Sequence, residues 1–129
     1  MRFLFSHKAV VMKKILIVDD CKVTVQALRA VLVKQGYDVD YVHDGEAGVA
    51  RVKNWNPDLL ILDVIMPGMD GLTSLYRIRS DSKNKTLPVI IHTSKGNMKD
   101  LFEDKNVVAF IEKPFDEEKL LRIIRSALS

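Results

Sequence analysis

Four short apolar runs in this 129-residue chain end in polar side chains of complementary chemistry. Asp19 and Asp20 follow the run KKILIV, and Asp63 follows LLIL. Thr93 ends VIIHT, and Lys113 follows AFIE. If each run is a strand of one parallel sheet, these ends open on the same edge, where open α/β sheets bind ligands. Three carboxylates, a hydroxyl and an ammonium then share one pocket, which suits a divalent cation with oxygen ligands beside a phosphoryl group.

The composition fits a single domain with one core, because the chain has 129 residues and a hydrophobic fraction of 47%. Twenty basic against 17 acidic residues give a net charge of +3. This excess is too small to indicate a nucleic-acid or membrane surface, so we expect neither direct nucleic-acid binding nor membrane insertion. Cys21 is the only cysteine, which excludes an intramolecular disulfide and a CxxC pair and favours a cytoplasmic location.

The first residues differ from the rest of the chain. Residues 1–12 mix apolar and basic side chains, but His7 and Lys8 interrupt the apolar run and no small-residue cleavage site follows. We therefore expect an N-terminal extension of unknown role at 1–12 and one domain at 13–129. A disordered tail, an additional packed element and an early start before Met12 remain open for the extension.

Strand-length apolar runs alternate with helical patterns through the domain, which is typical of repeated βαβ units. Residues 59–63 are apolar on both alternating faces, as in a central strand covered by helices on both sides. Val25, Leu28 and Leu32 share one helical face that can cover the sheet. The expected strands span residues 14–19, 38–42, 59–63, 89–93 and 109–112. The expected helices span residues 22–35, 46–53, 72–80, 98–105 and the segment from Asp116 onward.

Each polar strand end also has a simpler structural explanation. Paired aspartates after a strand are often helix caps, and for Asp19 and Asp20 alone we favour that role. Thr93 can bond to nearby backbone, and Lys113 can be a solvated lysine. A carboxylate at Asp63 has no obvious capping role and is costly to bury unpaired. Taken together, the simple explanations require four coincidences at equivalent places, so the joint pattern favours a site.

These residues resemble the receiver domain of two-component response regulators. The matching segments are ILIVDD, LLILDVIMPGMDG, VIIHTS and FIEKPF, and the resemblance covers residues 13–129. It implies a flavodoxin-like, doubly wound parallel sheet of five strands in the order 2-1-3-4-5, flanked by five helices.

The resemblance also implies a magnesium site. Asp63 is similar to the family's phosphoacceptor, and Asp20 and Asp63 correspond to side-chain ligands of Mg²⁺. Asp19 would support the ion through water, and the backbone carbonyl of Ile65 would be the remaining protein ligand. The chemistry is consistent, because Mg²⁺ keeps several waters and needs only one or two carboxylates.

The same resemblance assigns catalytic and switching roles. Lys113 would pair with a phosphoryl oxygen, and Thr93 would hydrogen-bond another after Asp63 is phosphorylated. Phe110 stands where many relatives have tyrosine, so a switching role and ordinary core packing are equally open for it. The implied partners are a sensor histidine kinase or phosphotransfer protein and a downstream protein target, and dimerisation upon phosphorylation is left open.

Other positions depart from the common pattern or have simple explanations. An apolar side chain at Ile65 would obstruct water, so we hypothesise slow self-dephosphorylation. His92 should be packed on the face opposite to Thr93, and His43 should lie away from the pocket. Nearby carboxylates should disfavour the Cys21 thiolate.

The resulting expectation is a phosphoacceptor signalling domain whose enzymatic character is limited to its own phosphorylation and dephosphorylation. One alternative is a phosphorylation-independent docking domain. The other is a small-molecule enzyme or cofactor binder on a flavodoxin-like fold, since fold does not fix function. That alternative lacks its motifs, because the chain has neither a GxGxxG nor a GxxxxGK[ST] phosphate loop.

Overall fold

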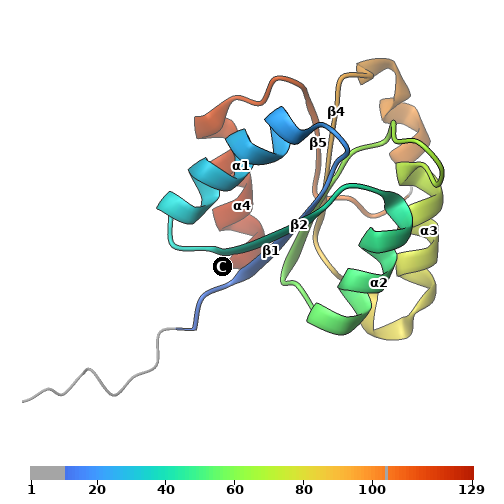
Figure 1. Ribbon diagram of the computed structural model, residues 1–129, viewed down its shortest axis with the longest axis horizontal. Helices are drawn as coiled ribbons and strands as arrows, with labels where there is room; N and C mark the ends of the chain where they lie inside the picture. The colour runs from blue at the N-terminus through green and yellow to red at the C-terminus, as the bar shows by residue number, and fades with distance from the viewer. Residues whose placement is uncertain (1–10, 104) are drawn as a thin grey trace, which may run out of the picture.

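The computed structural model describes residues 11–103 and 105–129. Its five strands form one parallel sheet in the order β2-β1-β3-β4-β5 (Figure 1). The strands are β1 (Lys14–Val18), β2 (Asp38–Val42), β3 (Leu59–Leu62), β4 (Val89–Thr93) and β5 (Ala109–Glu112). The helices are α1 (Lys22–Lys34), α2 (Gly45–Trp55), α3 (Gly71–Ser80) and α4 (Glu117–Leu128), with 3₁₀ segments η2 (Ser82–Asn84) and η3 (Gly96–Phe102). The predicted flavodoxin-like fold and strand order are confirmed.

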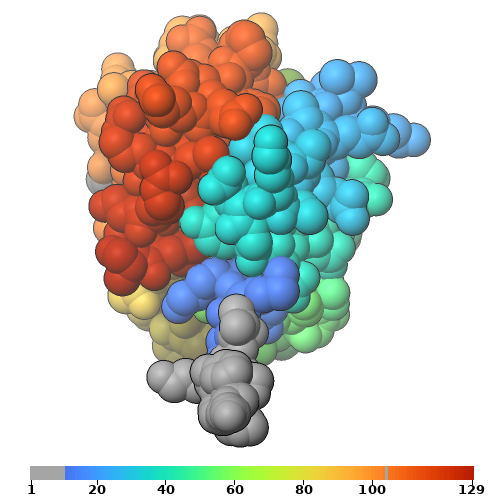
Figure 2. Space-filling view, turned by 90° about the vertical axis from the view of Figure 1, so that its left-hand side faces the viewer, coloured from blue at the N-terminus to red at the C-terminus, as the bar shows by residue number. Residues whose placement is uncertain are grey.

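Two helical layers cover the sheet. Helices α1 and α4 lie on one face and α2 and α3 on the other (Figure 1), and Figure 2 shows α1 and α4 side by side. Strand β3 is buried throughout: Leu60 and Leu62 enter the core on the α2–α3 face, whereas Leu59 and Ile61 enter the core on the α1–α4 face. Burial on both sides explains why this strand is apolar at every position.

Helix α1 buries the three residues that the sequence placed on one face, Val25, Leu28 and Leu32. It ends before Gly36, whose φ of +92° lies in the left-handed region that favours glycine at a helix C-terminus. Helix α4 begins after Asp116, whose side chain accepts a hydrogen bond from the Lys119 amide. Local chain chemistry therefore sets both helix boundaries.

The fourth helical segment differs from the prediction of a helix at 98–105. The 3₁₀ segment η3 (Gly96–Phe102) occupies the first part of that span, and residue 104 lies outside the described chain. In the described residues, the sheet is thus flanked by four α-helices, with a 3₁₀ segment in the fourth position. Phe102 is the only buried residue in η3, and no side chain caps its start. Met98 packs only partly against the core, so the segment gains little from packing and forms a short 3₁₀ turn.

Trp55 closes α2 at the edge of the sheet where the strands begin. The Lys14 ammonium donates a hydrogen bond to the Trp55 carbonyl at 2.7 Å and lies 5.3 Å from the centre of its ring. The Arg51 guanidinium lies 5.2 Å from the same ring and pairs with Asp40 at 2.6 Å. These contacts join α2 to β1 and β2 through cation–π and ionic interactions.

Ten residues of the predicted N-terminal extension, 1–10, lie outside the described part of the chain. Within the described part, no helix has the length and apolar character needed to cross a membrane.

Candidate functional site

Two neighbouring strands place buried carboxylates at the same edge of the sheet. Asp19 directly follows β1 and Asp63 directly follows β3, and the Asp63 amide donates a hydrogen bond to the Val18 carbonyl at 2.9 Å. The two aspartates are only 2% and 4% exposed, whereas Asp20 is exposed. Carboxylate oxygens of Asp19, Asp20 and Asp63 lie within 4.8 Å of one another. Parallel pairing of β1 with β3 thus gathers the three acids that the sequence singled out.

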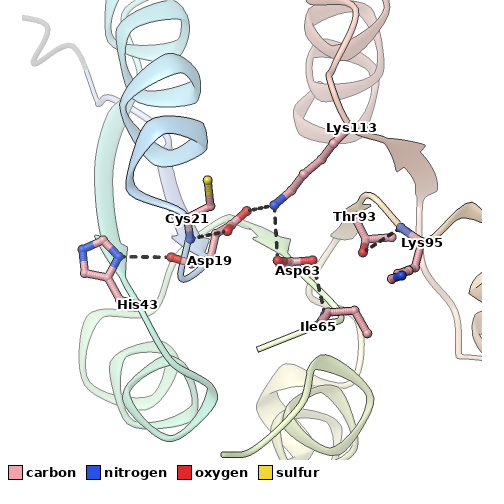
Figure 3. A network of polar contacts seen from close by, with 8 residues as sticks. All are labelled: Asp19, Cys21, His43, Asp63, Ile65, Thr93, Lys95 and Lys113. Carbon is pink, nitrogen blue, oxygen red and sulfur yellow. Dashed lines mark hydrogen bonds and ion pairs between the residues drawn. The ribbon is translucent and has the colours of Figure 1, made fainter. Parts of the chain in front are cut away.

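Lys113 reaches this cluster from the end of β5. Its ammonium lies 2.9 Å from an Asp19 oxygen and 3.2 Å from an Asp63 oxygen (Figure 3). The Lys113 amide donates a hydrogen bond to the Thr93 carbonyl at 2.8 Å, and the bond to Pro114 is cis. The alternative of a freely solvated lysine is therefore wrong, because the side chain is 16% exposed and pairs with two carboxylates.

The charges of the cluster do not balance, since one ammonium faces three carboxylates. Burial raises the pKa of Asp19, and the neighbouring Asp63 raises it further, although hydrogen bonds from Lys113 and the Cys21 amide oppose the shift. Burial alone lowers the pKa of Lys113, but Asp19 and Asp63 outweigh burial and raise it. The Lys113 ammonium thus has two carboxylate partners, whereas the three carboxylates share one ammonium. The cluster keeps an excess of negative charge that suits a cation.

Neither aspartate of the first pair caps α1. The N-cap position belongs to Cys21, whose side chain makes no capping hydrogen bond. The Cys21 amide instead donates to Asp19 Oδ1 at 2.9 Å, which fixes the carboxylate at the entrance to the helix (Figure 3). The capping explanation for Asp19 and Asp20 is therefore wrong, and Asp20 leaves its carboxylate exposed at the pocket mouth.

The loop after β3 positions Asp63 and Ile65. The Gly71 amide donates to the Val64 carbonyl at 2.8 Å, so α3 begins directly against this loop. A Cβ atom at Gly71 would lie 2.7 Å from the Val64 Cα and closer still to the Asp63 carbonyl. The Ile65 amide donates to Asp63 Oδ1 at 3.4 Å, and the Ile65 side chain is 46% exposed. The isoleucine therefore lies at the open side of the acidic cluster.

Thr93 and Phe110 come from β4 and β5. Thr93 is fully buried, and its hydroxyl oxygen accepts a hydrogen bond from the Lys95 amide at 3.3 Å (Figure 3). The local backbone contact expected for Thr93 is present. Phe110 is partly buried, packs on the α2–α3 side of the core and lies 6.0 Å from the Phe102 ring of η3. Both candidate switch residues thus contact the segment between β4 and β5.

His43 was predicted to lie away from the pocket, and its contact with the backbone of Asp19 was not anticipated. His43 Nδ1 lies 3.1 Å from the Asp19 carbonyl (Figure 3), because pairing of Val18 with Val42 puts the residues that follow β1 and β2 side by side. The signal was present in the parallel arrangement of the two strands, which brings successive strand ends together. His43 is thus a backbone support for the acidic cluster.

The predictions for Cys21 and His92 had different outcomes. The pKa of the Cys21 thiol is lowered, chiefly by hydrogen bonding with Thr24, so the expected suppression of the thiolate was wrong. His92 is packed, as predicted: it is 1% exposed and meets the Phe115 ring edge-on at 5.7 Å between ring centres. Burial lowers the pKa of His92 to about 4, so the ring is neutral at physiological pH.

A parallel sheet in the order 2-1-3-4-5, with acidic residues and a lysine at one edge, defines the receiver class of signalling domains. The chain belongs to this family: the family described as the response regulator receiver domain matches residues 15–125. It is therefore a receiver domain of two-component signalling.

Individual relatives agree with this assignment. The chain is 36% identical over 120 residues to Protein PilH of Pseudomonas aeruginosa, covering 92% of this chain and 99% of PilH. It is 34% identical to the DNA-binding dual master transcriptional regulator RpaA of Synechocystis, covering 91% of this chain but 49% of RpaA. The solved structure of the chemotaxis protein CheY4 of Vibrio cholerae is 29% identical, with a TM-score of 0.84 over 92% of this chain and 100% of CheY4. Some relatives thus match over their full length and others over about half.

Proposed function

We propose that this receiver takes a phosphoryl group onto Asp63 from the phosphohistidine of a sensor histidine kinase or phosphotransfer protein, in a reaction that requires Mg²⁺. The phosphorylated form then binds a downstream protein with altered affinity. The observation that carries the proposal is the placement of the buried Asp63 carboxylate, 3.2 Å from the Lys113 ammonium and within a cluster of three carboxylates whose charge one ammonium offsets only in part.

In this proposal, the side chains of Asp20 and Asp63 and the backbone carbonyl of Ile65 hold Mg²⁺, and Asp19 supports the ion through water. The three acids fit a hard cation because their oxygens converge and one of them is exposed to solvent. When bound, Mg²⁺ supplies positive charge to the oxygens of the transferring group. The chain's own contribution is to keep the carboxylates fixed, which the Cys21 amide does for Asp19.

The proposed transfer forms one bond and breaks another. An Asp63 oxygen attacks the phosphorus, the P–N bond of the donor breaks, and the donor imidazole leaves with the bonding electron pair. Lys113 neutralises a phosphoryl oxygen, and preorganised positive charge of this kind stabilises the transition state. Hydrolysis of the acyl phosphate by water restores Asp63. Phosphorylation and dephosphorylation of its own aspartate are the only reactions that we assign to the domain.

The output of the proposed switch is a change around β4 and η3. A phosphoryl group brings about −1.5 to −2 charges and new acceptor oxygens to Asp63. Thr93 would then donate its hydroxyl hydrogen to one of these oxygens, and its movement toward Asp63 would disturb the present contact, in which its hydroxyl oxygen accepts from the Lys95 amide. Movement at Lys95 would be passed to η3, where Phe102 contacts Phe110. A partner that recognises this surface would distinguish the two forms.

Intact mass spectrometry tests the proposal directly. After incubation with Mg²⁺ and acetyl phosphate, we expect one phosphoryl adduct on the wild-type protein and on Asp38→Asn, a control at an exposed position of β2. The adduct should disappear in Asp63→Asn and in the presence of a chelator. Absence of an adduct on folded wild-type protein, also with a phosphohistidine donor, would overturn the proposal and favour a phosphorylation-independent docking domain.

A further inference from the structure

A second recess lies on the outer side of α3, apart from the acidic cluster. It has a volume of about 560 Å³, within the range of binding sites in proteins. One wall is α3, and the opposite wall contains Lys85 and the residues before β5, including Asn106. The loop wall lies between η3, which ends at Phe102, and β5, which begins at Ala109.

The α3 wall has an apolar stripe that follows the helix. Leu72, Leu75, Tyr76 and Arg79 line the recess at positions i, i+3, i+4 and i+7, which share one side of a helix. Leu75 is 1% exposed and forms part of the core, whereas Tyr76 is 75% exposed at the rim. The stripe covers about two helical turns, so the recess is a groove with an apolar floor and a free aromatic side chain at its edge.

Arg79 holds the two walls together. Its guanidinium donates hydrogen bonds to the carbonyls of Asn84 at 2.9 Å, Leu87 at 2.6 Å and Asn106 at 3.0 Å. These partners connect α3 to both neighbouring loops, so the groove is formed before any ligand arrives. A preformed site binds with a smaller loss of conformational entropy.

The groove is positively charged. Among the described residues, its lining includes Arg79, Lys85 and Lys105 and no acidic side chain. The partners of the Arg79 side chain are neutral carbonyls, its Nε has no hydrogen-bond partner, and no carboxylate of the described chain lies within ion-pair distance. Burial lowers the pKa of Arg79, which reflects the cost of holding this charge away from water. An anion at the groove would offset that cost.

We propose that this groove docks an amphipathic helix of a partner protein, with apolar residues against α3 and acidic residues toward Arg79 and Lys85. A linear apolar stripe of helical spacing is the surface that a second helix fills, with anchors at i, i+3 or i+4, and i+7. Exposed tyrosine is a frequent anchor at such interfaces. The proposal goes beyond phosphoryl transfer, since it assigns a second surface that does not contain Asp63.

Segments of this chain fit the groove less well. Residues 1–10 carry Arg2 and Lys8 and no acidic residue, so like charges would oppose their binding. Helix α4 begins with acidic Glu117 and Glu118, but its apolar Leu120 and Ile124 are already buried against the sheet. Charge and availability therefore point to a different protein as the source of the acidic helix.

A random peptide library displayed on phage tests this assignment without assuming a sequence. Peptides selected on the wild-type protein and counter-selected on Tyr76→Ala should be enriched in acidic residues, with apolar residues at i, i+3 or i+4, and i+7. The leading synthetic peptide should bind Lys85→Glu and Tyr76→Ala about tenfold more weakly, which corresponds to about 1.4 kcal/mol. Amide chemical shifts in α3 should change upon binding.

Matched variants and a small ligand complete the test. Lys83→Glu and Tyr41→Ala change an exposed lysine and a half-exposed tyrosine outside the groove and should leave the affinity unchanged. An unaltered urea unfolding curve shows that each variant is folded and keeps this test independent of that of Asp63. Failure to enrich acidic amphipathic peptides would overturn the proposal. Equal affinity of the leading peptide for Lys85→Glu and for the wild-type protein would overturn it too. So would binding of decanoate at the groove when no peptide binds, because the groove would then be a site for a small amphipathic anion.

Discussion

Asp19 is the acid on which burial and a neighbouring carboxylate act in the same direction. Both raise its pKa, and the single ammonium nearby is shared with Asp63. Its ionised form is thus less stable in the folded protein than in the unfolded chain. The protonated carboxyl of Asp19 therefore favours the folded state. This stabilisation is fully present below the ordinary aspartate pKa of 3.8 and is lost as the pH rises through the higher pKa of the folded state.

We therefore expect Asp19→Asn to be more stable than the wild-type protein at neutral pH when a chelator removes metal. The amide can still accept the Cys21 hydrogen bond and lacks the unfavourable charge. The advantage should shrink as the pH falls toward 3.8, where the wild-type carboxyl is neutral. Urea unfolding across a pH series measures the difference, with Asp38→Asn as an exposed control. A variant that is less stable than wild type at neutral pH would contradict the charge argument.

Ile65 provides a kinetic prediction at the same site. Its side chain is 46% exposed beside Asp63, where an apolar group limits water without orienting it. Replacing Ile65 with Asn should shorten the phosphoryl half-life roughly threefold to tenfold, or about 0.6–1.4 kcal/mol of barrier. Decay of the adduct by intact mass is the measurement. Leu101→Asn, at a residue 48% exposed in η3, should decay as the wild type does, and an unchanged rate in Ile65→Asn would sink the idea.

The acids and the lysine were predictable because each ends a strand. Their proximity follows from parallel pairing alone, so no side-chain detail was needed to place Asp19, Asp63 and Lys113 together. The contact of His43 with the Asp19 carbonyl was missed because we did not apply the same rule to β2. The Cys21 prediction failed for a different reason: its pKa depends on a local hydrogen bond with Thr24, which sequence spacing does not reveal.

At the scale of elements, the joint between β3 and α3 leaves no room for a side chain at Gly71. A methyl group at Gly71 would meet the backbone of Asp63 and Val64, which cannot move without displacing the acid. We expect Gly71→Ala to lower the free energy of unfolding by roughly 2–3 kcal/mol through overpacking. It should also slow phosphorylation by acetyl phosphate. Urea unfolding and adduct formation measure the two effects.

Gly36→Ala is the matched control for this joint. Gly36 has a φ of +92°, but a Cβ atom at this position would meet nothing within 4 Å, so the substitution strains only the backbone. It should cost about 1 kcal/mol and leave phosphorylation unchanged. Equal losses of stability and of phosphorylation in the two variants would show that contact with the Asp63 loop is not what Gly71 provides.

Helix and strand boundaries were predicted within one or two residues wherever an apolar face or a cap defined the element. Helix α1 has Val25, Leu28 and Leu32, and α4 has the Asp116 cap. The region of η3 lacked both signals, because Phe102 is its one fully buried residue and Met98 is only partly buried against the core. Whether such a polar segment forms α-helix or 3₁₀ depends on tertiary contacts, such as the approach of Gly96 to the Glu112 side chain, which no local pattern encodes.

At the scale of the whole molecule, the sheet separates two ends with different tasks. The ends of β1, β3 and β5 carry the acids and the lysine, and the starts of β1 and β3 are joined by hydrogen bonds. The Lys14 amide, for example, donates to the Asp58 carboxylate at 2.8 Å. The acidic cluster and the contacts between strand starts thus lie at opposite ends of the strands.

Trp55 lies beside Lys14 and Arg51 at the end of the sheet where the strands begin, and it is the only tryptophan in the chain. Its fluorescence should therefore change sharply when the protein unfolds and stay nearly constant when Mg²⁺ or a phosphoryl group is added. A fluorescence titration with Mg²⁺ that shows strong quenching would contradict this placement. On this prediction, Trp55 fluorescence reports unfolding and does not respond to phosphorylation of Asp63.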